Sequence, residues 1–211
     1  LTMTLPPYQT ASGCTDIILH TMERYFIKEN NMDITDGFAE SLMRTVMKHT
    51  RILMKEPNNY ESRAEVMWAG SLSHNDITGS RSFGDWACHQ LEHELSGMYK
   101  VAHGAGLAAV WGSWARYVYQ EQPSRFAQYA RNVMGIREEN DVECALAGIE
   151  ATEQFFKEIG MPTSIHEMGI TLCEEDIRKL AWKCSFEDER TIGCFKVLKK
   201  EDMENIYRIA K

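Results

Sequence analysis

The sequence predicts an all-α protein, and three observations support this class. Apolar residues recur at intervals of three and four along most of the chain, which is the spacing of one face of a helix. Sustained alternation of apolar and polar residues, the pattern of a half-buried strand, is absent. Prolines and capping pairs stand at the ends of the apolar segments rather than inside them. We therefore expect one helical bundle domain over residues 1–211.

The first half of the chain predicts four helices. Pro57 ends the second of them, and Asn58 with Glu61 three residues later forms a capping pair that opens the third. Glycine and serine mark a loop before the fourth. In chain order, the predicted helices cover 12–29, 36–55, 58–72 and 85–98, and the loop covers 75–84.

The second half predicts five further helices. A very apolar helix follows Gly104 and Gly106 and ends at Tyr119, and His103–Gly106 is interpreted as a turn. Thr171 and Glu174 have the spacing of a capping box. The remaining helices are predicted over 123–135, 140–159, 171–184 and 201–210.

Composition limits the classes of function. The net charge of −8 argues against non-specific binding to nucleic acid or to an anionic membrane. No segment approaches the ~20 apolar residues of a membrane span, and the N-terminus lacks the pattern of a signal peptide. Six cysteines without a Cys-x-x-Cys pair favour reduced thiols in a cytoplasmic protein. Since the chain begins at Leu1, we expect it to be part of a longer protein.

One acidic residue and several histidines predict a metal site. Asp16 and His20 lie four residues apart, and His89 and His93 repeat that spacing, so each pair shares a helical face. His103 follows closely. Asp16 and His20 flank an apolar run, where a buried carboxylate is costly unless a metal or another charge offsets it. One carboxylate and three histidines also leave an open position on a metal, as catalysis requires.

Other interpretations of these residues remain open. A single histidine on a helix is more often structural than a ligand, and we interpret His49, His74 and His166 in this way. The segment His89–His93 also fits the H-x-x-E-H pattern of zinc peptidases, with Glu92 as general base. A metal-dependent phosphohydrolase would normally carry a His-Asp dipeptide, which this chain lacks. The last alternative is a non-enzymatic helical interaction module.

Three long motifs resemble the C-terminal domain of the iron-containing (group III) alcohol dehydrogenases, in the butanol dehydrogenase branch. The motifs are LPPYQTASGCTDIILHTMERYF, GDWACHQLEHELSGMYKVAHGAGLAAVWGSWARY and MPTSIHEMGI. The resemblance implies Asp16, His20, His89 and His103 as metal ligands, and His93 as a residue near nicotinamide and substrate. It also implies a separate N-terminal α/β nucleotide-binding domain as partner and a homodimer. A glycerol dehydrogenase is a more distant alternative within the superfamily.

The resemblance implies a reaction as well. Fe²⁺, or Zn²⁺ as the alternative, would act as a Lewis acid on the oxygen of an alcohol or aldehyde. Hydride would pass to or from NADH or NADPH, which the N-terminal domain would hold. Short-chain primary alcohols such as butanol are the expected substrates. His93 would relay a proton or orient the nicotinamide or substrate. Without the nucleotide-binding domain, we expect this chain to be inactive.

Overall fold

Helices form the regular structure of the chain, which confirms the predicted all-α class. The computed structural model describes residues 2–28, 31–79 and 84–211. Within these residues the β-structure is limited to a single antiparallel bridge between Ile192 and Leu198. Residue 29, the predicted end of the first helix, and residues 80–83 of the predicted loop lie outside the described ranges. The described part of the first helix already ends at Tyr25, so its predicted extension to 28 is wrong.

The described residues form nine α-helices and three short 3-10 helices. The α-helices are α1 (Pro7–Tyr25), α2 (Asp33–Lys55), α3 (Tyr60–Ser73), α4 (Ala87–Tyr99), α5 (His103–Val118), α6 (Pro123–Asn132), α7 (Asp141–Glu158), α8 (Glu174–Cys184) and α9 (Lys200–Ala210). The 3-10 helices are η1 (Thr2–Thr4), η2 (Tyr119–Glu121) and η3 (His166–Met168).

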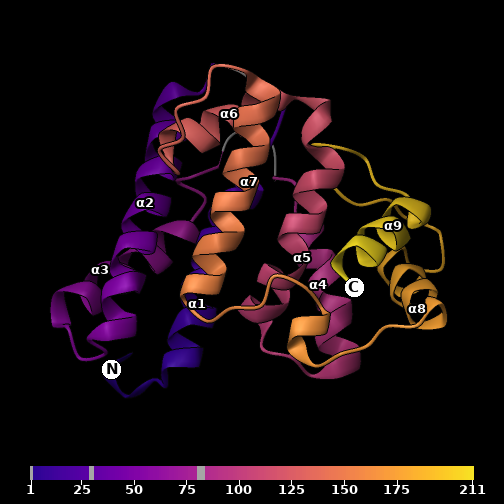
Figure 1. Cartoon of the computed structure of the whole chain (residues 1–211), viewed down its shortest axis with the longest axis horizontal. Coiled ribbons are helices and arrows are strands. Elements are labelled where there is room, and N and C mark those ends of the chain that lie inside the picture. Colours follow the sequence, from indigo (N-terminus) through magenta and orange to yellow (C-terminus); the bar gives the residue numbers. More distant parts are fainter. Residues whose placement is uncertain (1, 29–30, 80–83) are drawn as a thin grey trace.

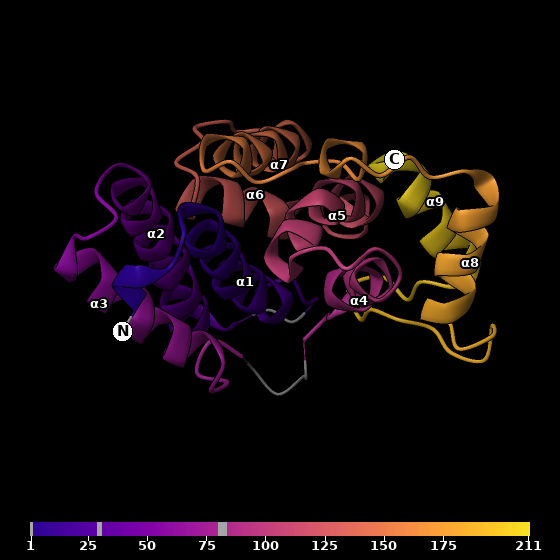
Figure 2. The ribbon, with the colours of Figure 1, turned by 90° about the horizontal axis from the view of Figure 1, so that it is seen from below.

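Helices α1 and α5 lie at the centre of the arrangement. Helices α2 and α3 pack on one side of α1, while α4, α7 and α9 contact α5. Figures 1 and 2 show the pair α2 and α3 at one end of the molecule and the pair α8 and α9 at the other. Because α1 and α5 contact each other directly, residues from the two central helices and from α4 can meet at one place.

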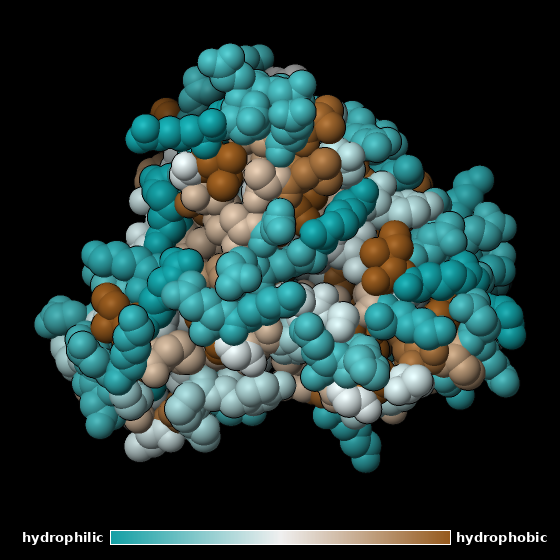
Figure 3. Space-filling view, viewed as in Figure 1, coloured by the Kyte–Doolittle hydropathy of each residue, from teal (hydrophilic) through white to brown (hydrophobic). Residues whose placement is uncertain are grey.

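Helix α5 is buried almost all round, which explains its apolar sequence. Trp111 and Trp114 are 0% and 2% exposed and belong to the main core, so both are packing residues. Hydrophilic side chains cover most of the face in Figure 3, with small hydrophobic groups between them. In the described part of the chain, no helix has both the length and the apolar character needed to cross a membrane.

Two glycines allow other groups to approach α5 closely. A β-carbon at Gly104 would overlap the backbone oxygen of Ser12 in α1. A β-carbon at Gly106 would lie 2.6 Å from Glu92 Oε1 in α4. The interpretation of His103–Gly106 as a turn is therefore wrong, because these residues form the first turn of α5. Their glycines serve close packing rather than a change of chain direction.

Several helix ends differ from the predictions. Helix α1 begins at Pro7, well before residue 12, because proline suits the first turn of a helix. Asn59 rather than Asn58 caps α3, and its side chain accepts a hydrogen bond from Ser62 N. Helix α8 begins after Cys173, which pairs with Asp176 in a capping box, instead of after Thr171.

Left-handed residues bracket helix α4. Trp86 precedes it with φ of 60° and Lys100 follows it with φ of 55°. Residues other than glycine adopt this conformation at a cost of roughly 1–2 kcal/mol, so surrounding contacts must fix it. Asp85 supplies such contacts, because its carboxylate accepts hydrogen bonds from the backbone N–H groups of Ala87, Cys194 and Phe195.

Candidate metal centre

Three helices bring the four predicted metal ligands together. Asp16 and His20 lie in α1, His89 lies in the first turn of α4, and His103 is the first residue of α5. Asp16 Oδ1 lies 3.5 Å from Nε2 of His20, 3.6 Å from Nε2 of His89 and 3.4 Å from Nε2 of His103. The predicted set is therefore a cluster in space, centred on one carboxylate oxygen.

The cluster has the properties expected of a site for a divalent ion. With metal–ligand bonds near 2.1 Å, ligand atoms of a tetrahedral centre lie about 3.4 Å apart. The three distances to Asp16 Oδ1 match this spacing. Asp16 Oδ1 and His89 Nε2 are buried and make no hydrogen bond with the described residues. Burying such atoms without a partner is costly, and a cation would satisfy both. These residues fit a metal.

Two buried carboxylates orient two of the histidines by contacting the ring nitrogen that does not face Asp16. Glu23 Oε1 lies 3.0 Å from His89 Nδ1 and also accepts a hydrogen bond from the His89 backbone N–H. Glu92 contacts His103 Nδ1 and accepts a hydrogen bond from Ser96 Oγ. Each carboxylate leaves the Nε2 atom of its histidine directed at Asp16. Such carboxylate–histidine pairs fix the tautomer and ring orientation of metal ligands.

Sequence reasoning did not assign Glu23 and Glu92 this role. Glu23 is 2% exposed and Glu92 is fully buried. Both occupy positions of α1 and α4 that face the protein interior. A glutamate among apolar residues at helical spacing is a signal that could have found them, since buried carboxylates need partners.

The electrostatics of the cluster keep Asp16 ionised. Burial raises the pKa of Asp16, but the contacts with His103 and His89 outweigh it and hold the pKa well below its usual range. Asp16 and Glu92 together raise the pKa of His103 to about 10. Burial opposes a similar effect on His89, whose pKa still rises because of Asp16 and Glu23. Burial lowers the pKa of His20 to about 3.

Glu92→Gln is expected to weaken binding of Zn²⁺ by roughly 10- to 100-fold, the usual effect of losing a group that orients a ligand. The neutral amide supports the His103 ring less strongly than the carboxylate. Competition with a chromophoric chelator measures this change in dissociation constant. Glu94→Gln on the same helix is the control and should leave the constant unchanged. Equal affinities for the two variants would contradict the orienting role of Glu92.

His93 lies next to the cluster but on its exposed side. Its ring stacks on that of His103, with centroids 5.6 Å apart and an angle of 26° between the planes. The pKa of His93 lies below its usual value, mainly because of partial burial. His93 is therefore near the four predicted ligands without lying among their atoms around Asp16.

His74 is the residue whose sequence interpretation the structure changes most. It follows α3, and its Nε2 lies 3.8 Å from Asp16 Oδ2. Its ring centroid is 3.9 Å from that of His20. Asp16, His20 and His74 form one group of potential ligand atoms, and Asp16, His89 and His103 form another. In contrast, His49 Nδ1 pairs with Ser62 Oγ, as expected of a structural histidine.

The position of Glu92 argues against the zinc-peptidase alternative. A general base in such a motif must reach a water molecule on the metal. Glu92 is fully buried, lies against His103 and Ser96, and is covered by Gly106. His93, the second ligand of that motif, is exposed and does not lie against Asp16. The sequence pattern H-x-x-E-H is present without the geometry that the peptidase reaction needs.

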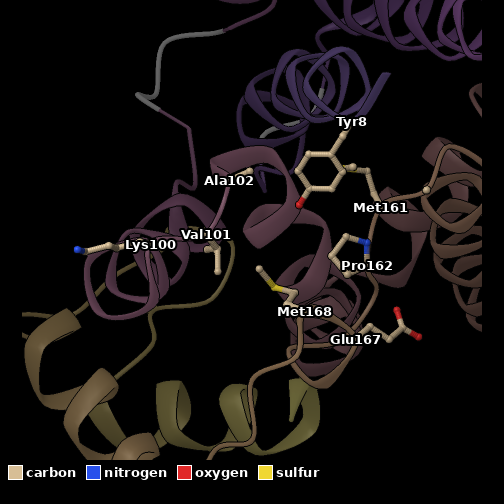
Figure 4. Close-up of a pocket in the computed structure, with 9 residues that line it drawn as sticks. Tyr8, Lys100, Val101, Ala102, Met161, Pro162, Glu167 and Met168 are labelled. Atoms are coloured by element: carbon tan, nitrogen blue, oxygen red, sulfur yellow. The ribbon is translucent and has the colours of Figure 1, made fainter. Parts of the chain in front are cut away.

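A cavity of about 590 Å³ lies near the cluster, and Figure 4 shows its lining. Tyr8 comes from α1, Ala102 from the connection between α4 and α5, Met161 from the segment after α7, and Met168 from η3. Ala102 directly precedes His103 in the chain, but none of the clustered histidines lines this cavity. The cavity is therefore a neighbour of the cluster and not part of it.

Fold and cluster together define a class of protein. This is an all-helical domain that carries a histidine–carboxylate cluster with the spacing of a divalent-metal centre. The profile described as Fe-containing alcohol dehydrogenase family, C-terminal, matches residues 10–211. The chain therefore belongs to the iron-containing alcohol dehydrogenase family and corresponds to its C-terminal domain. The family resemblance of the sequence motifs is confirmed.

Curated relatives and solved structures agree with this assignment. NADH-dependent butanol dehydrogenase A of Clostridium acetobutylicum is 35% identical over 98% of this chain and 53% of its own length. NADPH-dependent aldehyde reductase YqhD of Escherichia coli is 38% identical over 80% of this chain and 44% of its own length. The structure of NADH-dependent butanol dehydrogenase A from Thermotoga maritima superimposes with a TM-score of 0.92 at 38% identity, covering 99% of this chain and 53% of that one. This chain spans about half the length of these relatives.

Proposed function

We propose that the chain is the metal-binding half of an NAD(P)-linked alcohol dehydrogenase or aldehyde reductase that acts on short-chain primary alcohols such as butanol. The single observation that carries the proposal is the placement of three histidine Nε2 atoms around Asp16 Oδ1 in a member of this family. Relatives named as butanol dehydrogenases and as an aldehyde reductase support this substrate class. The nucleotide, NADH or NADPH, would be held mainly by an N-terminal half like that of the relatives.

Asp16, His20, His89 and His103 would hold Fe²⁺, with Zn²⁺ as the alternative, since imidazole and carboxylate suit both ions. When bound, the ion supplies Lewis-acid polarisation of the substrate oxygen. Asp16 contributes the negative charge, and Glu23 and Glu92 hold the rings of His89 and His103 in place. His93 would hold or release a proton at its ring, or orient the nicotinamide or substrate. A homodimer and a cytoplasmic location complete the proposal.

The test compares this chain alone with the same chain joined to the N-terminal half of its own protein. We expect NADH or NADPH plus butanal to give no turnover with the chain alone, and metal-dependent turnover with the joined protein. Metal content, measured by plasma mass spectrometry, should be about one iron or zinc per chain in wild type and should be lost in His89→Ala. Turnover by the chain alone would contradict the two-half mechanism. Metal-free wild type that also fails to bind added Fe²⁺ or Zn²⁺ would overturn the metal site.

A further inference from the structure

The ring of His74 is oriented in the way that is typical of a metal-binding histidine. Its Nδ1 lies 2.9 Å from the backbone oxygen of Gly70, which can only accept a hydrogen bond. Ser73 Oγ lies 2.7 Å from the same Nδ1 and itself donates a hydrogen bond to the Gly70 oxygen, so both neighbours of Nδ1 can accept a hydrogen bond from it. A hydrogen on Nδ1 leaves the lone pair of the neutral ring on Nε2. Nε2 is the atom that lies 3.8 Å from Asp16 Oδ2. Ligating histidines commonly donate their other N–H to a carboxylate or a backbone carbonyl.

His20, by comparison, lacks this support. Its Nδ1 is buried and has no hydrogen-bond partner in the part of the chain that the structure describes. His89 and His103 have Glu23 and Glu92, and His74 has the Gly70 carbonyl. Three histidines around Asp16 thus have an oriented Nε2, and His74 is one of them although it lies at the exposed edge of the cluster.

Hydrogen bonds from Arg24 of α1 hold the segment that contains His74 in place. The Arg24 guanidinium donates hydrogen bonds to the backbone oxygens of His20 and Ser73, and it pairs with Asp76. His74 therefore has a defined position relative to α1, even though its side chain is 44% exposed. The side chain of His89, which approaches the other carboxylate oxygen of Asp16, is only 5% exposed.

We propose that Asp16, His20 and His74 form an outer position that holds a divalent ion on its way between solvent and the inner position, where His89 and His103 join Asp16 and His20. The inference rests on the proposed function in that it takes the inner position as the site of the working metal. The ligand atoms of Asp16, His20 and His74 lie within 4.8 Å of one another, as do those of Asp16, His89 and His103, so Asp16 belongs to both positions. One ion at a time occupies the pair, because both positions use Nε2 of His20, and one imidazole nitrogen has a single lone pair for a metal.

The test follows uptake of Co²⁺ by the metal-free chain in a stopped-flow absorbance experiment. Since the outer position lies on the route of the ion, His74→Ala should slow uptake and release alike by about tenfold, which corresponds to a barrier higher by ~1.4 kcal/mol. The equilibrium dissociation constant should then change little. His166→Ala, a histidine in η3 outside the cluster, is the matched control and should keep wild-type rates. Equal rates in the two variants would overturn the outer position.

A second measurement isolates the outer triad. In His89→Ala/His103→Ala, weak Co²⁺ binding should persist through Asp16, His20 and His74, and a further His74→Ala change should abolish it. Circular dichroism checks that the variants fold, and if the double variant does not, the kinetic comparison decides. Wild type that binds Co²⁺ while His74→Ala behaves like wild type overturns only the outer position. Wild type that binds no divalent ion overturns the proposed function as well.

Discussion

Asp16→Asn is expected to abolish tight metal binding, with a loss in affinity for Zn²⁺ of about 100-fold or more, above the effect of losing an orienting group. Asp16 Oδ1 is the common neighbour of His20, His89 and His103 Nε2. Asparagine keeps the size of the side chain but removes the charge, and the cation then meets a neutral oxygen between imidazole rings. A carboxylate is a far stronger partner for a divalent ion than a neutral amide.

Isothermal titration with Zn²⁺ measures the effect of Asp16→Asn directly. Asp33→Asn is the matched control, because Asp33 is an exposed residue of the first turn of α2. The control should bind one ion with wild-type affinity. If Asp16→Asn bound Zn²⁺ within a few-fold of wild type, Asp16 could not be the centre of the site.

Gly104→Ala is expected to destabilise the fold by about 3 kcal/mol, at the upper end of the usual cost of overpacking. The new methyl group would overlap the Ser12 backbone oxygen, and a backbone atom cannot rotate away as the end of a side chain can. Helices α1 and α5 must then separate. Since Asp16 lies on α1 and His103 on α5, their 3.4 Å contact lengthens and metal affinity falls at the same time.

Urea unfolding of the metal-free chain gives the stability change, and Zn²⁺ titration gives the change in affinity. Gly97→Ala is the control, because a β-carbon at this exposed site of α4 meets no atom within 4 Å. Alanine is the better helix former, so this control should gain about 0.5–1 kcal/mol. A Gly104→Ala protein as stable as the control would show that close contact between α1 and α5 is not needed.

Much of the fold was predictable because helical periodicity is a local property of the sequence. The helix over 140–159 was predicted from its apolar spacing, and in the structure Asn140 Oδ1 caps it by accepting hydrogen bonds from Val142 and Glu143 N–H. Caps at α3 and α8 were assigned to neighbouring residues, because several polar residues there could serve and tertiary contacts decide between them. The start of α5 was missed because two glycines disfavour a helix locally. Only the packing of Ser12 and Glu92 against them explains their presence.

The candidate site was predictable where its residues share a helix and not where they depend on tertiary packing. Spacing indicated the pairs Asp16–His20 and His89–His93. His74 lies just after the end of α3 and has no second candidate ligand at helical spacing. Its approach to Asp16 depends on how α3 packs against α1. Glu92 was visible in the sequence only as part of a peptidase motif. Its contact with His103 arises because Gly106 lets α4 and α5 approach closely.

The left-handed residues at both ends of α4 limit which sequence changes this domain can accept. Trp86 and Lys100 fix where the helix begins and ends, so its length cannot adjust freely. One inserted residue would turn everything beyond it by about 100° around the axis, the rotation per residue of an α-helix. His89 and the chain leading to His103 would then face different directions. We expect evolution, and protein engineers, to change only side chains of this helix that lie away from the cluster and to place length changes in the surrounding loops.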